Sequence, residues 1–144
     1  MADAGVNHAA DGAADTGAAG VVVGLGTDVV EVERFRLAMQ RRGARLEERL
    51  FSEAEREYAR THRDPAPRLA ARFAAKEAVM KALGAGLGDL AFRDVEVVRA
   101  SSGAPDLALT GRAAALARSR DVHRWHVSLS HTGTTAIAVA LALA

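Results

Sequence analysis

Two carboxylates are the residues of this sequence best suited to bind a metal ion. Asp28 follows a short apolar run and precedes a helical pattern, so its side chain is expected at the end of a strand. Glu77 lies in a later helical pattern, four residues before Lys81. Magnesium prefers oxygen ligands and usually takes one or two carboxylates, together with substrate phosphates and water. Asp28 and Glu77 are therefore candidate magnesium ligands.

The same residues also have structural interpretations. Asp28, or Thr27 before it, has the right residue type to be the N-cap of the following helix. Glu77 and Lys81 have the spacing of an ion pair on the surface of a helix. Two carboxylates alone do not decide between these interpretations, and both stay open at this point.

The helix expected over residues 68–83 has no clearly polar face of the kind that is exposed to solvent. Its large apolar residues cluster on one side, and they are Leu69, Phe73, Val79, Met80 and Leu83. A surface helix would carry its charges on the opposite side, but here that side is alanine: Ala71, Ala74, Ala75, Ala78 and Ala82. The helix nevertheless contains Arg72, Lys76, Glu77 and Lys81. Buried charges are costly unless they are paired, bound to a metal or facing a polar ligand, so this helix is a candidate site element.

A second cluster of charged side chains lies between residues 34 and 49. This segment contains six arginines but only two glutamates, so positive charge is in excess. The whole chain has a formal net charge of only +1, so this excess is local. Such a helix is either simply solvated or meets an acidic partner. The chain has one Trp, one Tyr and four Phe, and it therefore lacks the aromatic platform of a single-strand nucleic-acid binder.

Other common site motifs are missing. The chain has no cysteine, which excludes disulfides and thiolate metal sites. Gly24 and Gly26 lack the third glycine of a dinucleotide-binding fingerprint. His131 lies between Ser130 and Thr132 at the turn of the last expected hairpin, where it is either a phosphate contact or an ordinary loop histidine.

Periodicity predicts the elements that carry these groups. Helices are expected over about residues 31–43, 53–62, 68–83 and 110–119. Strands are expected over residues 21–30, 92–97, 107–109, 125–130 and 136–143. Ser52 and Glu55 have the spacing of a capping box, and Gly84 has the residue type that ends a helix. This order predicts an α+β fold with a largely antiparallel sheet.

The 144 residues fit one domain. Residues 1–20 are poor in large apolar side chains and are expected to be a disordered tail, which leaves residues 21–144 as the single domain. No apolar run reaches the ~20 residues of a membrane span, and the first residues do not have the pattern of a signal peptide. The protein is therefore expected to be cytoplasmic and not to bind a membrane.

Taken together, these motifs resemble the holo-[acyl-carrier-protein] synthase family of 4′-phosphopantetheinyl transferases. The segment 24–34 (GLGTDVVEVER) is similar to the first signature of that family, and 72–84 (RFAAKEAVMKALG) is similar to the second. The segments 51–55, 92–97 and 126–131 resemble the link and the later strands of the family. The likeness covers about residues 21–143.

The resemblance implies a transferase that moves 4′-phosphopantetheine from coenzyme A to a serine of an apo acyl carrier protein, with 3′,5′-ADP as the second product. It implies a magnesium ion bound by Asp28 and Glu77. Lys81 would orient a phosphate or help to remove the serine proton, directly or through water. The remaining implied coenzyme A ligands are Arg72, Lys76, Gly84, Ser130, His131 and Thr132.

The resemblance also implies partners and an assembly. Arg34, Arg41 and Arg45 correspond to basic positions that would dock an acidic carrier protein of fatty acid, or polyketide, biosynthesis. Relatives of this size are homotrimers with active sites at subunit interfaces, which would also explain a helix that is buried on both faces. Two other classes compete with this interpretation: a non-catalytic basic binding module and an unrelated magnesium-dependent nucleotide enzyme.

Overall fold

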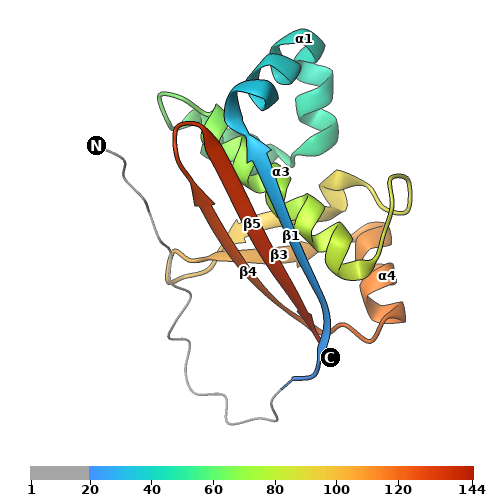
Figure 1. Ribbon diagram of the computed structural model, residues 1–144. Helices are drawn as coiled ribbons and strands as arrows, with labels where there is room; N and C mark the ends of the chain where they lie inside the picture. Colours follow the sequence, from blue (N-terminus) through green and yellow to red (C-terminus); the bar gives the residue numbers. More distant parts are fainter. Residues whose placement is uncertain (1–19) are drawn as a thin grey trace.

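The computed structural model describes residues 20–144, so the tail expected over residues 1–20 lies outside the described residues except for Gly20 (Figure 1). The elements in chain order are β1 (Val22–Glu31), α1 (Val32–Leu50), α2 (Glu53–Arg60), α3 (Ala66–Leu83), the 3₁₀ helix η1 (Phe92–Asp94), β2 (Val95–Arg99), β3 (Pro105–Leu109), α4 (Gly111–Ser119), β4 (Arg124–His131) and β5 (Thr135–Leu143). This order confirms the α+β prediction.

The strands form two antiparallel sheets rather than one. β5 lies in the middle of a three-stranded sheet, between β1 and β4, and β2 pairs with β3 in a separate hairpin. In this register Asp28 of β1 lies opposite Ala138 of β5. Asp28 is therefore a residue within a strand and not a helix N-cap, because Glu31 holds the N-cap position of α1.

Small residues bring α3 very close to the three-stranded sheet. A Cβ atom added to Gly26 would lie 1.8 Å from the backbone oxygen of Ala78, and one added to Gly24 would lie 2.0 Å from that of Ala82. The side of β5 that faces α3 is alanine at every inward position, and these are Ala136, Ala138, Ala140 and Ala142. Glycine is required where two backbones approach so closely. The Gly24-x-Gly26 motif therefore fixes the distance between β1 and α3.

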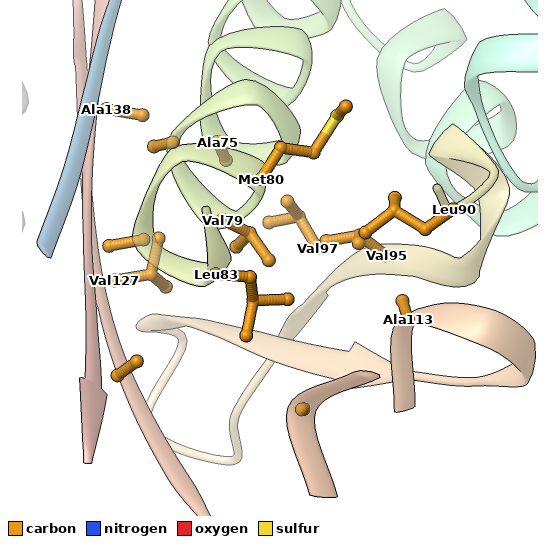
Figure 2. Close-up of a cluster of buried hydrophobic side chains, with 14 of the residues drawn as sticks. Ala75, Val79, Met80, Leu83, Leu90, Val95, Val97, Ala113, Val127 and Ala138 are labelled. Carbon is orange, nitrogen blue, oxygen red and sulfur yellow. The ribbon is translucent and has the colours of Figure 1, made fainter. Parts of the chain in front are cut away.

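The main core lies on both sides of α3 (Figure 2). Val127 and Ala138 approach α3 from the three-stranded sheet, while Val95 and Val97 approach it from the β2–β3 hairpin. One chain thus covers both faces of this helix. The double burial of α3 consequently needs no second subunit, which corrects the reason given above for expecting a trimer.

The outer face of the three-stranded sheet is apolar and exposed. Leu25 and Val29 of β1 have 64% and 61% of their surface accessible, and Ile137 and Val139 of β5 have 39% and 37%. Their neighbours along each strand point inward against α3, as the alternation of a strand requires.

No helix in the described part of the chain has the length and hydropathy to cross a membrane.

α1 is interrupted at Gly43, where φ is 64° and ψ is −159°. The helical path therefore changes direction within the range Val32–Leu50, as the bend in Figure 1 shows. Arg36 anchors the first part of α1 by two hydrogen bonds to the carboxylate of Asp64, each 2.7 Å long. Arg34 and Arg41 therefore lie before the break, and Arg45 lies after it.

Candidate active site

A cavity of about 760 Å³ lies between β1, α1 and α3. Asp28, Glu31 and Glu77 line it together with Arg34 and Arg42. The rest of its wall is mainly apolar and includes Phe35, Met39, Leu46, Phe73, Leu87 and Phe92. The cavity therefore brings the two candidate metal ligands to one end of an apolar pocket.

Lys81 lies directly beside Asp28. Its Nζ donates hydrogen bonds to Asp28 Oδ1 and to the backbone oxygen of Thr27, both at 2.9 Å. The hydrogen bond to Asp28 raises the pKa of Lys81, so this side chain is an ammonium. The expected group of Asp28, Glu77 and Lys81 is thus assembled within one chain.

Glu77 lies deeper than Lys81 and is half-buried. Burial raises the pKa of its carboxyl, and the negative charge of Asp28 raises it further, while Lys81 acts in the opposite direction. Two carboxylates therefore repel each other across this end of the pocket. A second positive charge would relieve that repulsion.

This donor set fits a magnesium ion. Both donors are carboxylates, the ligands that this hard cation prefers. Within residues 20–144, no group of three or more His, Cys, Asp and Glu side chains is placed to hold a metal ion. Asp28 and Glu77 would therefore leave coordination positions for water and for substrate phosphates, which suits a metal that acts on a phosphate ester.

Lys76 has a different place from the one expected. Its side chain has no exposed surface, and its Nζ lies 2.8 Å from Glu55 Oε2. It also donates to the backbone oxygens of Phe92 and Val95. Burial lowers the pKa of Lys76, and the carboxylate of Glu55 opposes that shift. Since all of its donors point into the protein, Lys76 cannot reach a coenzyme A phosphate, and that expectation is wrong.

Glu55 is a residue whose full role the sequence did not reveal. It completes the predicted capping box with Ser52, which the structure confirms. Its second oxygen accepts a hydrogen bond from the backbone nitrogen of Val97, 2.9 Å away. Glu55 thus joins α2, α3 and β2 through one buried carboxylate. The capping-box spacing was visible in the sequence, but it gave no sign of Lys76 as a partner.

A second, smaller cavity of about 190 Å³ lies between α2, α3, the β2–β3 hairpin and β4. Arg72, Ser130 and His131 line it, so three of the expected coenzyme A ligands meet here. Burial lowers the pKa of His131, and the positive charge of Arg68 lowers it further. The lowered pKa favours the neutral form of His131, so the positive charge of the cavity comes from its arginines. Tyr58, Arg68 and Arg99 also line it, and the sequence had not identified them.

The other expected site residues lie outside these two cavities or at their rims. Thr132 Oγ1 accepts hydrogen bonds from the backbone nitrogens of Thr134 and Thr135 and so holds the β4–β5 turn. Gly84 ends α3 in the left-handed conformation, as predicted, with φ of 61°. Arg34, Arg41 and Arg45 are exposed, and Arg34 also lines the larger cavity.

Comparison with known proteins gives one consistent family. The model of the 4′-phosphopantetheinyl transferase superfamily matches residues 24–141. The holo-[acyl-carrier-protein] synthase of Frankia alni is 50% identical over 121 residues, which cover 84% of this chain and 97% of that protein.

Solved structures agree with that match. The holo-[acyl-carrier-protein] synthase of Neisseria meningitidis superimposes with a TM-score of 0.79 at 27% identity, over 86% of this chain and 100% of that one. The synthase of Bacillus anthracis in complex with CoA (3′,5′-ADP) has a TM-score of 0.71 at 31% identity, over 85% and 97% of the two chains. This chain therefore belongs to the 4′-phosphopantetheinyl transferase superfamily and, within it, to the family of the holo-[acyl-carrier-protein] synthases.

Proposed function

We propose that this enzyme transfers 4′-phosphopantetheine from coenzyme A to a serine of an apo acyl carrier protein and releases 3′,5′-ADP. The observation that carries the proposal is that Asp28 and Glu77 line one pocket and Lys81 pairs with Asp28, all three contributed by the two segments that resemble the family signatures. The bond that forms joins the serine oxygen to the β-phosphorus of coenzyme A. The bond that breaks joins this phosphorus to the oxygen that bridges the two phosphates.

Asp28 and Glu77 hold a magnesium ion in this proposal. When bound, the ion neutralises the charge of the pyrophosphate and of the departing 3′,5′-ADP. Asp28 reaches the site from β1 and Glu77 from α3, and the close contact of Gly24 and Gly26 with α3 keeps these two elements together. The rigidity of that contact positions the two carboxylates.

Lys81 acts as a cation rather than as the direct base. Its raised pKa keeps it protonated beside Asp28, and an ammonium has no lone pair to accept the serine proton. It can orient a phosphate oxygen once the substrate is bound. Of the two alternatives for proton removal, the arrangement thus favours a route through water.

The smaller cavity holds a phosphate of coenzyme A. Arg72 and Arg68 provide the positive charge, and His131 and Ser130 lie beside them as hydrogen-bonding groups. Thr132 shapes the adjoining turn, and the Gly84 turn gives the pantetheine arm room to enter the larger cavity. Lys76 has no direct part in binding, because it is fully buried.

The enzyme forms a homotrimer with shared active sites. The two cavities have no lining residue in common, and in this proposal a neighbouring subunit brings one cavity of each kind together around coenzyme A. The exposed apolar face around Leu25, Val29, Ile137 and Val139 supports this assembly, because such patches usually mark protein interfaces.

The carrier protein docks on α1 through Arg34, Arg41 and Arg45. Carrier proteins of this kind are small and acidic; these arginines are exposed, and Arg34 also lines the larger cavity. The proposed setting is fatty acid biosynthesis, or polyketide biosynthesis, in the cytoplasm.

The decisive experiment is to incubate the protein with coenzyme A, Mg²⁺ and an apo acyl carrier protein, and then to measure the molecular mass of the carrier by mass spectrometry. A mass increase equal to one phosphopantetheine group, absent when the metal is chelated, is the expected result. Binding of the carrier without a change in its mass would instead indicate a non-catalytic basic binding module.

A further inference from the structure

The smaller cavity contains an unusual stack of side chains. The guanidinium of Arg72 lies 4.2 Å from the centre of the Tyr58 ring, and that of Arg99 lies 5.3 Å from it. Arg99 Nη1 also donates a hydrogen bond to Tyr58 Oη at 3.0 Å. One tyrosine therefore holds two arginines from two different elements, α3 and β2.

The charges in this cavity are not balanced locally. Arg68, Arg72 and Arg99 line it, and no Asp or Glu of residues 20–144 is among its lining residues. Guanidinium groups that lie side by side repel each other, and the electron-rich face of a tyrosine ring offsets part of that repulsion. Tyr58 thus keeps two cations together where they would otherwise separate.

Arg72 is also incompletely hydrogen-bonded. Only 7% of its surface is exposed, and burial lowers the pKa of its guanidinium. Its Nη1 donates a long bond of 3.4 Å to the backbone oxygen of Arg68, and its Nε has no hydrogen-bond partner within the described residues. A buried cation with unused donors is unfavourable in isolation but favourable when an anion binds.

We propose that Tyr58 is a positioning residue that makes this cavity selective for a terminal phosphomonoester, by holding Arg72 and Arg99 in place before the substrate arrives. The inference rests on the proposed function, because it assigns the 3′-phosphate of coenzyme A to this cavity. Ordering two arginines in advance removes the entropy that binding would otherwise cost. Tyr58 therefore acts on affinity for the phosphorylated nucleotide and leaves the transfer step unchanged.

The test compares adenosine 3′,5′-bisphosphate with adenosine 5′-phosphate, which lacks the 3′-phosphate, by isothermal titration calorimetry. Tyr58→Leu removes the ring and should weaken bisphosphate binding about tenfold or more, with little change for the monophosphate. Tyr58→Phe keeps the ring but loses the bond to Arg99, and it should lie between the wild type and Tyr58→Leu. Arg60→Gln, which removes an exposed cation from the same helix, is the matched control and should change neither affinity.

The same variants are then assayed for transfer with coenzyme A and with dephospho-coenzyme A. The expected result is a raised KM for coenzyme A, an unchanged kcat, and a smaller preference for coenzyme A over its dephospho form. A merely structural role would lower binding of both nucleotides alike and reduce the thermal stability of Tyr58→Phe in parallel, and that outcome would overturn the inference.

The two proposals fail in different ways. A wild-type protein that modifies no carrier would overturn the proposed function, while the comparison of the two nucleotide affinities would still report on the role of Tyr58. A wild-type protein that transfers phosphopantetheine but binds both nucleotides equally well would overturn only the role of Tyr58.

Discussion

Asp28 and Glu77 both place a carboxylate in the larger cavity, but the two carboxylates lie in different environments. Asp28 is neutralised by Lys81, whose ammonium is 2.9 Å away. Glu77 is half-buried, and burial together with the charge of Asp28 raises the pKa of its carboxyl. Metal binding at this site therefore requires the loss of a proton from Glu77 at low pH, and it should weaken as the pH falls.

Removing either carboxylate should abolish metal binding and nearly abolish transfer. Asp28→Asn and Glu77→Gln preserve size while removing the negative charge, so each takes away a magnesium ligand. Mg²⁺ titration by calorimetry and the carrier mass assay measure the two effects. Glu33→Gln, a change to an exposed carboxylate on α1 that pairs with Arg36, is the control. Near-normal turnover of either variant at limiting magnesium would show that the metal assignment is wrong.

The buried pair of Glu55 and Lys76 predicts a stability effect instead. Lys76→Met leaves Glu55 as an unpaired buried charge, which should lower the free energy of unfolding by about 3–5 kcal/mol. The double variant with Glu55→Gln should recover part of this loss, because no net charge then remains buried. Urea unfolding followed by circular dichroism measures both. If Lys76→Met kept its stability and only raised the KM for coenzyme A, Lys76 would be a ligand after all.

At the scale of elements, the contact between β1 and α3 determines the active-site geometry. Asp28 lies two residues beyond Gly26 on β1, and Glu77 lies one residue before Ala78 on α3. Any separation of these two backbones would therefore move the carboxylates apart. Close-packed interiors poorly tolerate extra atoms placed between two elements, because the elements must then move apart.

Gly26→Ala should destabilise the protein by about 3 kcal/mol or more, because its Cβ would lie 1.8 Å from the backbone oxygen of Ala78. The melting temperature, measured by calorimetry, reports the effect. Gly133→Ala is the matched control, since a Cβ at Gly133 meets nothing within 4 Å. Equal melting temperatures for the two variants would mean that β1 can move away from α3 without cost.

The arginines of α1 should govern the encounter with the carrier protein. Arg41→Glu and Arg45→Glu should raise the KM for the carrier several-fold and flatten its dependence on salt, because exposed charges mainly set association rates. The KM for coenzyme A should hardly change. Arg34→Glu should also lower kcat, since Arg34 lines the cavity that contains Asp28.

Steady-state kinetics at several salt concentrations provide the measurement. Arg118→Glu, a reversal of an exposed charge on α4, is the control and should leave both KM values unchanged. Equal losses of affinity for the carrier and for coenzyme A in the Arg41 and Arg45 variants would indicate that α1 binds the nucleotide.

At the scale of the whole molecule, the single chain presents two separate cavities. Asp28, Glu77 and Lys81 line or adjoin one cavity, and Arg72 and His131 line the other. The exposed apolar sheet face lies on the same chain and has no cover within residues 20–144. In the proposed homotrimer, each active site combines the metal-binding cavity of one subunit with the phosphate-binding cavity of the next.

Mixing inactive chains tests this arrangement. An equal mixture of Asp28→Asn and His131→Ala chains, assayed at low coenzyme A, should restore roughly a quarter of the sites by random assembly. A mixture of Asp28→Asn and Lys81→Ala should restore none, because these residues pair within one chain. Light scattering of the wild type should give a trimer. A monomer at the working concentration, or no recovery in the first mixture, would rule out shared sites.

Interactions between residues that are close in sequence made many features of this protein predictable. The capping box of Ser52 and Glu55, the end of α3 at Gly84 and the order of the elements depend on residues that are close together in the chain. The two signature segments likewise predicted that Asp28, Glu77 and Lys81 form one group, and the structure brings these three residues together. These features needed no knowledge of what each element packs against.

The partners of the charged residues on α3 were decided only by the tertiary structure. Lys76 and Lys81 lie five residues apart on one helix, yet one pairs with Glu55, 21 residues away and buried, and the other with Asp28, 53 residues away and facing the cavity. Helical periodicity separates the faces on which the two lysines lie, but it does not say which face meets a carboxylate from another element. The glycines of β1 and the alanines of β5 fix the position of α3 against the sheet, and this packing places Lys76 in the interior and Lys81 beside Asp28.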